Sequence, residues 1–195
     1  MNESRGSMSL LSSAKAKIDN GFSRLGPKLD FTDPAQRTLM LLASRTISIS
    51  NAVVLLSRHD LSTEAVPLLF SLIGIAAQMR WIAEKDHSQR AREFSSELRQ
   101  SASGWFWDVA KLKEKMARMD FDSQLIDALD HVLLEHIEGN VEGLPWGHSL
   151  PESRKGLTQD ELLDVAALAI RHVLKALDAF WPGSFEIASI EMEGK

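Results

Sequence analysis

Apolar residues recur at helical spacing along most of the chain, and alternation typical of strands is scarce. Residues 9–24 carry a mixed helical pattern, which Gly26 and Pro27 interrupt. We expect this N-terminal segment, residues 1–31, to be a peripheral helix or arm. Taken with the segments below, the pattern predicts an all-α fold, a single-domain bundle of about six helices.

The second helix has a clear start. Asp33 suits the N-cap, Pro34 suits the first helical position, and Gln36 completes a box-like arrangement. The helix is predicted to run from there to Arg58. One stripe of it is polar at helical spacing and consists of Arg37, Ser44, Ser48, Asn51 and Arg58. Such a stripe permits close helix packing, and it also makes Ser48 and Asn51 candidates for lining a ligand pocket.

The third helix is predicted from about Ser62 to Asp86. Its stretch from Ala65 to Met79 is almost wholly apolar and lacks charge. That stretch is shorter than the roughly 20 residues a membrane-spanning helix needs, so we expect a buried helix and no membrane. The short connection over residues 59–61 predicts an antiparallel hairpin with the preceding helix.

The next segment, residues 87–119, is helical and charged, with an interruption at 101–104 that predicts two helices or one kinked helix. It is basic, whereas the following stretch from Arg118 to Arg154 contains acids and no lysine or arginine between its ends. We expect these oppositely charged segments to lie beside each other, within one chain or across a dimer.

A fifth helix is predicted from Asp122, as its cap, to about Glu138. The last helix has a capping box of Thr158 and Glu161, and Pro182 with Gly183 ends it. The predicted bundle therefore covers residues 32–183, and an acidic tail covers 184–195.

Composition narrows the classes of function. The 195 residues are typical of one soluble domain, with 44% hydrophobic and 25% charged residues. The absence of cysteine excludes disulfides, thiolate metal sites and a cysteine nucleophile. A net charge of −5 argues against a dedicated nucleic-acid binder, and without a signal-peptide pattern we expect a cytoplasmic protein.

A candidate metal or acid–base site lies in the fifth predicted helix. Asp127, His131 and Glu135 are spaced by four residues and share one helix face. Carboxylate, imidazole and carboxylate could hold a divalent metal, or orient His131 as a general base. The alternative, which we favour, is a solvated acidic face, because no second helix carries matching ligands.

A second candidate lies at the end of the third helix, where Arg80 and His87 are separated by six residues. This spacing resembles the Arg-x(4–6)-His motif of the HEPN helical domains, many of which are metal-independent ribonucleases. The resemblance implies that Arg80 steadies the scissile phosphate and His87 does acid–base work, often across a dimer. That family prefers a small polar residue or histidine after the arginine, where this chain has Trp81.

The long connection over residues 139–157 is rich in glycine and proline, and it contains Trp146 and His148. A loop of this length with a bulky aromatic residue can cover a pocket. The alternative, which we favour, is that Trp146 pins the loop to the bundle.

The stretch Leu61–Ile82 resembles the central helix of uncharacterised bacterial all-α families of unknown function, whose pattern is Ala-x-x-Leu-Leu-Arg-Ser-Leu-x-Glu followed by an aromatic residue. The matching positions here are Ala65, Leu68, Leu69, Ser71, Leu72 and Trp81. Phe70 and Gly74 stand where those families have the arginine and the glutamate. The resemblance implies a fold and no activity.

Three functional hypotheses follow. The first is a non-enzymatic helical module that acts through a protein partner or a small ligand, as a homodimer and without a cofactor. The second is a ribonuclease that uses Arg80 and His87, the only hypothesis with a nucleic-acid partner. The third is a metal-dependent bundle enzyme around His131.

Overall fold

The computed structural model describes residues 3–100, 109–123, 125–129 and 158–185. These residues contain no strand, so the predicted all-α fold is confirmed. A short helical stretch also covers residues 125–129. The principal elements are α1 (Glu3–Leu25), the 3-10 turn η1 (Gly26–Lys28), α2 (Pro34–Arg58), α3 (Ser62–Glu84), α4 (His87–Gln100), α5 (Val109–Arg118) and α7 (Gln159–Phe180).

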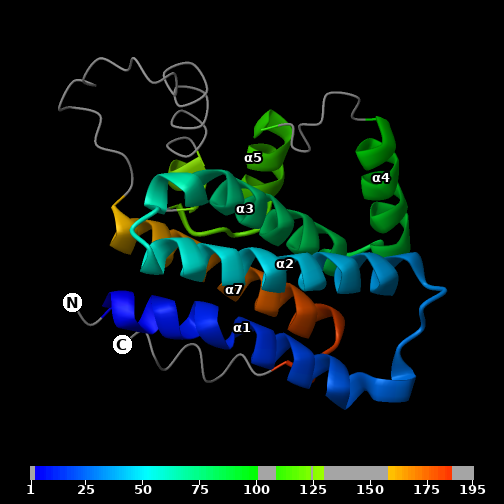
Figure 1. Ribbon diagram of the computed structural model, residues 1–195. Coiled ribbons are helices and arrows are strands. Elements are labelled where there is room, and N and C mark those ends of the chain that lie inside the picture. Colours follow the sequence, from blue (N-terminus) through cyan, green and yellow to red (C-terminus); the bar gives the residue numbers. More distant parts are fainter. Residues whose placement is uncertain (1–2, 101–108, 124, 130–157, 186–195) are drawn as a thin grey trace.

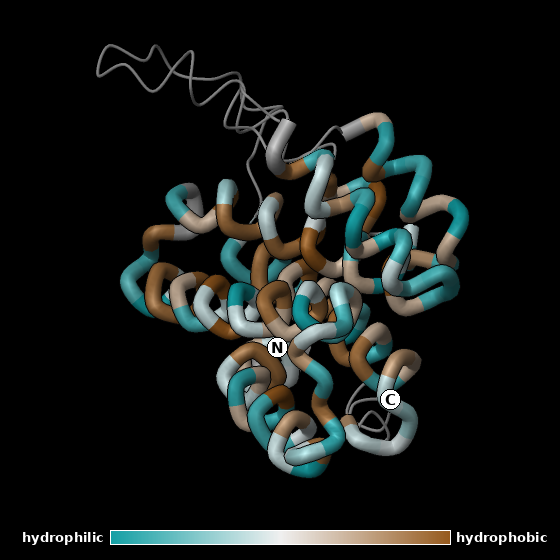
Figure 2. Tube along the Cα trace, turned by 90° about the vertical axis from the view of Figure 1, so that its right-hand side faces the viewer, coloured by the Kyte–Doolittle hydropathy of each residue, from teal (hydrophilic) through white to brown (hydrophobic). Residues whose placement is uncertain are grey.

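Four long helices, α1, α2, α3 and α7, form the body of the molecule (Figure 1). α7 packs against α1, α2 and α3, and its contact with α3 is the most extensive in the fold. α4 and α5 stand on this body: α4 contacts α2 and α3, and α5 contacts α3. Hydrophobic segments gather where the helices meet, and hydrophilic ones lie outward (Figure 2). The core is therefore shared by all four long helices.

α2 and α3 form the predicted hairpin. Judged by length and composition alone, both helices are long and apolar enough to cross a membrane. The two helices differ in burial. In α3, 72% of the most apolar stretch is buried, as in the core helix of a soluble protein, whereas in α2 only 44% is buried. α2 thus keeps apolar residues outside the core.

The N-terminal helix is more deeply packed than the expected peripheral helix or arm of residues 1–31. Leu11, Ala14 and Ile18 of α1 are fully buried and belong to the main core. The Ser7 hydroxyl also donates to Asp164 Oδ1 of α7 over 2.6 Å. The mixed pattern of the sequence concealed this because only a narrow stripe of α1 is apolar.

The start of the predicted tail, residues 184–195, is also anchored. Phe185 is buried and packs edge-on against Phe22 of α1, with ring centres 5.3 Å apart. Gly21 makes this possible, because a Cβ there would overlap the Phe185 ring. The rest of the predicted tail lies outside the described residues.

Helix starts follow the prediction, with one difference. Asp33 caps α2 by accepting from the Ala35 N–H over 3.0 Å. The Gln36 side chain accepts from the Asp30 N–H instead of closing a box with Asp33. It therefore stabilises the turn before the helix. The capping box of Thr158 at the start of α7 is present as predicted.

Candidate functional site

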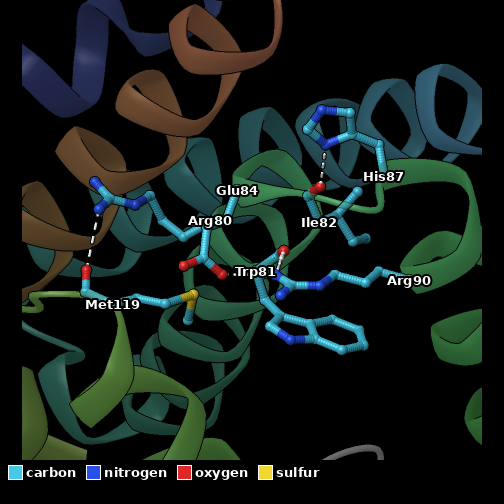
Figure 3. Close-up of polar contacts among 7 residues, drawn as sticks. All are labelled: Arg80, Trp81, Ile82, Glu84, His87, Arg90 and Met119. Atoms are coloured by element: carbon cyan, nitrogen blue, oxygen red, sulfur yellow. Dashed lines mark hydrogen bonds and ion pairs between the residues drawn. The ribbon is translucent and has the colours of Figure 1, made fainter.

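Arg80 and His87 both lie where α3 ends and α4 begins, but the Arg80 guanidinium extends away from His87, and the two side chains bind different backbone oxygens (Figure 3). The Arg80 guanidinium donates to the Met119 carbonyl oxygen over 3.0 Å, just past the end of α5. It also lies 5.9 Å from the centre of the Phe121 ring. Arg80 thus satisfies a carbonyl at a helix C-terminus, where a cation also interacts favourably with the helix dipole.

His87 is bound in a similar way. Its Nδ1 lies 2.7 Å from the backbone oxygen of Ile82 (Figure 3). Because a carbonyl oxygen can only accept, Nδ1 carries the proton of this hydrogen bond. The ring also packs edge-on against Phe180 of α7, with centres 4.9 Å apart. His87 therefore caps the last turn of α3, and the single chain does not bring it to a common site with Arg80.

A third side chain, Arg90 of α4, binds the same end of α3. Its guanidinium donates to the Trp81 carbonyl oxygen and, over 2.8 Å, to the Glu84 carboxylate (Figure 3). The hydrogen bond from Arg90 is the main cause that lowers the pKa of Glu84. The guanidinium also lies over the Trp81 ring, 4.9 Å from its centre. These contacts fix α4 on α3.

Lys115 of α5 lies over the same ring, with Nζ 4.0 Å from the centre of Trp81. It donates to Gln78 Oε1 over 3.1 Å and lies 3.8 Å from a Glu97 carboxylate oxygen. Burial lowers its pKa. Trp81 therefore interacts with one cation from α4 and one from α5 and holds both helices to α3.

This arrangement of Trp81, Arg90 and Lys115 was not predicted from the sequence. The residues come from three helices, and no local spacing relates them. Each cation already has an oxygen or ring partner, which makes the cluster a structural joint between helices.

A buried histidine of α7 pairs with an exposed carboxylate from the segment that follows α5. His172 of α7 is 1% exposed, and its Nε2 lies 3.0 Å from Asp122 Oδ2. The ring stacks on Phe121, with centres 3.9 Å apart and planes at 10°. Nδ1 has no hydrogen-bond partner among the residues that the structure describes. Asp122, predicted as a helix cap, uses its side chain for His172.

The pair has the form of a catalytic dyad but not its electrostatics. Burial lowers the pKa of His172 to about 4, against the opposing effect of the Asp122 hydrogen bond. A base this weak is poorly matched to proton transfer near neutral pH, and the imidazole is closed to solvent. The pair instead binds the segment after α5 to α7. The sequence did hold one signal: His172 lies between Ala169 and Ala176 on the buried stripe of α7.

The polar stripe of α2 faces solvent, and it contains Ser48 and Asn51, the two candidates for lining a pocket. Both side chains are exposed. The Ser48 hydroxyl donates to the Ser44 carbonyl oxygen of its own helix over 3.3 Å. Leu41 and Leu55 are exposed on the same stripe, at 63% and 58%. We call this surface the α2 face; it consists of Arg37, Leu41, Ser44, Arg45, Ser48, Asn51, Leu55 and Arg58.

Of the predicted metal residues, Asp127 is described and is exposed. His131 and Glu135 lie outside the described residues, as do Trp146 and His148 of the long connection. Within the part of the chain that is described, no group of three or more His, Asp or Glu side chains is placed to hold a metal ion.

Comparison with models of known protein families, with curated proteins and with solved structures found no match to this chain.

Proposed function

We propose that this protein is a non-enzymatic helical module that acts by binding another protein through the α2 face. The observation that supports this is the exposure of Leu41 and Leu55 on a helix whose opposite side is in the core. Large apolar residues that recur on one exposed side of a helix are typical of a surface that packs against another helix. The histidines and arginines that suggested catalysis are, where described, engaged in contacts between helices.

The chemistry of the α2 face favours a protein partner over a lipid surface. Ser44, Ser48 and Asn51 occupy the space between the two leucines, and such polar groups are costly to insert among acyl chains. Small side chains instead allow the backbone of a partner helix to approach closely. Helix-on-helix contact therefore fits this face better than insertion into a bilayer.

Photo-crosslinking in cells that naturally express the protein tests the proposal. We would place the photoreactive residue p-benzoylphenylalanine at Ser48, with a matched control at Ser12, an exposed position in α1. The proposal predicts a light-dependent protein adduct from Ser48 that the Ser12 control lacks. Adducts of equal yield from the two positions, or none from either, would contradict it.

A further inference from the structure

We propose that the partner of the α2 face is the same face of a second copy of the chain. The two α2 helices would run antiparallel, related by a two-fold axis at Ser48. This inference rests on the proposed function and names its partner. Three properties of the α2 face support it: its register, its charges and the placement of its apolar residues.

The register of the face is self-complementary. Leu41, Ser48 and Leu55 are spaced by seven residues and lie on one line along α2. In an antiparallel pair centred on Ser48, each Leu41 meets Leu55 of the second copy, and the two Ser48 residues meet each other. A two-fold interface requires such a self-complementary patch.

The residues beside this line are also compatible with a second copy. Ser44 comes next to Asn51 of the other chain, where a hydroxyl and an amide can exchange a hydrogen bond. Arg45 comes next to Ala52 of the other chain, so the two Arg45 side chains do not face each other. The small side chains at the centre let the two backbones approach closely.

The charges at the ends of α2 favour the antiparallel direction. Asp30 and Asp33 precede the helix, and Arg58 is its last residue, while α2 itself contains no acid. Antiparallel packing places Arg58 of one copy near these aspartates of the other, at both ends of the pair. It also brings Arg37 near Asp60, which follows the partner helix. Parallel packing would instead place Arg58 of one copy beside Arg58 of the other, so that two positive charges meet.

The exposed apolar side chains are concentrated on this element. Of the five large hydrophobic residues exposed in the described part of the chain, Leu41 and Leu55 lie on α2, and Phe31 and Leu61 lie just before and just after it. A single helix pair is a small interface, at the size typical of transient complexes. We therefore expect a reversible dimer with a dissociation constant on the order of 10 μM.

The chain has no cysteine, so single cysteine variants test the register directly. Under mild oxidation, the Ser48→Cys variant should form a disulfide between two copies much faster than the control Ser12→Cys. When the Leu41→Cys and Leu55→Cys variants are mixed, the disulfide that joins one variant to the other should form in preference to a disulfide between two copies of the same variant. Preference for disulfides between copies of the same variant would contradict the antiparallel arrangement. Equal rates of disulfide formation for Ser48→Cys and Ser12→Cys would contradict the interface.

Sedimentation velocity tests the dimer without oxidation, over about 1 to 500 μM protein. The unmodified chain should pass from monomer to dimer, and Ser48→Arg should weaken the dimer at least tenfold because it opposes two charges at the axis. Ser12→Arg should have no effect. Circular dichroism checks that both variants are folded. A monomer over the whole range, or a dimer unaffected by Ser48→Arg, overturns the proposal.

Failure of this inference is distinguishable from failure of the proposed function. A monomeric chain that still forms a specific adduct from Ser48 with a different protein overturns the second copy and leaves the interaction module. A monomeric chain without such an adduct overturns both. If the monomeric chain sediments with phosphatidylglycerol vesicles, and Leu41→Asp abolishes this binding, the partner of the α2 face is a membrane surface and not a protein.

Discussion

His87 caps the helix that precedes it, since its Nδ1 donates to the Ile82 carbonyl oxygen 2.7 Å away. Arg80 does the same for α5 by donating to the Met119 carbonyl oxygen. The two residues whose spacing resembles a nuclease motif thus stabilise two different helix ends. Within one chain, their positions are explained by packing and capping alone.

His87→Ala should lower the free energy of unfolding by about 1 kcal/mol, because the Ile82 carbonyl loses its partner. The loss of the contact with Phe180 adds to this effect. Urea denaturation monitored by circular dichroism measures the change. His59→Ala is the matched control, since His59 is exposed in the turn after α2 and should be neutral.

The same two proteins test the ribonuclease hypothesis. We expect neither the unmodified chain nor His87→Ala to cleave a labelled single-stranded RNA in the presence of a chelator. Cleavage by the unmodified chain that His87→Ala abolishes, with the fold intact, would show that His87 has a catalytic role.

His172 should make stability depend on pH. Its pKa is about 4 in the fold and 6.5 in the unfolded reference. Above pH 6.5 both states are neutral, and the contribution to stability is complete. As the pH falls from 6.5 to 4, the unfolded chain takes up a proton that the folded chain does not, so about 3 kcal/mol is lost over this window.

Urea denaturation at several pH values should therefore give a shallower pH dependence for His172→Phe than for the unmodified chain. His59→Phe, at an exposed position in the turn after α2, is the matched control. Equal pH dependence in His172→Phe and the unmodified chain would show that His172 is not the group responsible.

Arg80→Met should raise the pKa of His172, because the nearby positive charge of Arg80 is one of the causes that lower it. It should also cost about 1–3 kcal/mol, because the Met119 carbonyl loses a charged donor. NMR titration of the His172 ring reports the pKa. Arg92→Met, at an exposed position of α4, is the control and should change neither quantity.

Two glycines of α1 should respond in opposite ways to alanine. Gly21→Ala should destabilise the fold by about 1–3 kcal/mol, because the new Cβ displaces the buried Phe185 ring. Gly6→Ala should stabilise it by up to about 1 kcal/mol, since the site has open space and alanine favours a helix. Thermal unfolding measures the stability of both variants. Equal changes in stability for Gly21→Ala and Gly6→Ala would contradict the packing of Phe185 on α1.

Features set by neighbouring residues were predictable from the sequence. Asp33 and Thr158 begin helices where expected, because an N-cap bonds to backbone groups two or three residues away. Gln36 shows the limit of this local reasoning. The predicted box required its side chain to accept from the Asp33 N–H, but it accepts from the Asp30 N–H.

Features set by tertiary packing were not predictable. Asp122 and His172 are 50 residues apart, and their pairing depends on how α7 docks. The same holds for Lys115, which reaches Trp81 from α5. The polar stripe through Ser48 and Asn51 was identified correctly as a stripe, but periodicity does not distinguish a face toward solvent from one toward a cavity.

Native mass spectrometry of gently purified protein at about 50 μM, several times the expected dissociation constant, shows whether the α2 face joins two copies of the chain. We expect a species of twice the 21.7 kDa chain mass, with no further bound mass, and a single-chain mass for Ser48→Arg. A single-chain mass for the unmodified protein at this concentration, or a dimer that Ser48→Arg leaves intact, would contradict it.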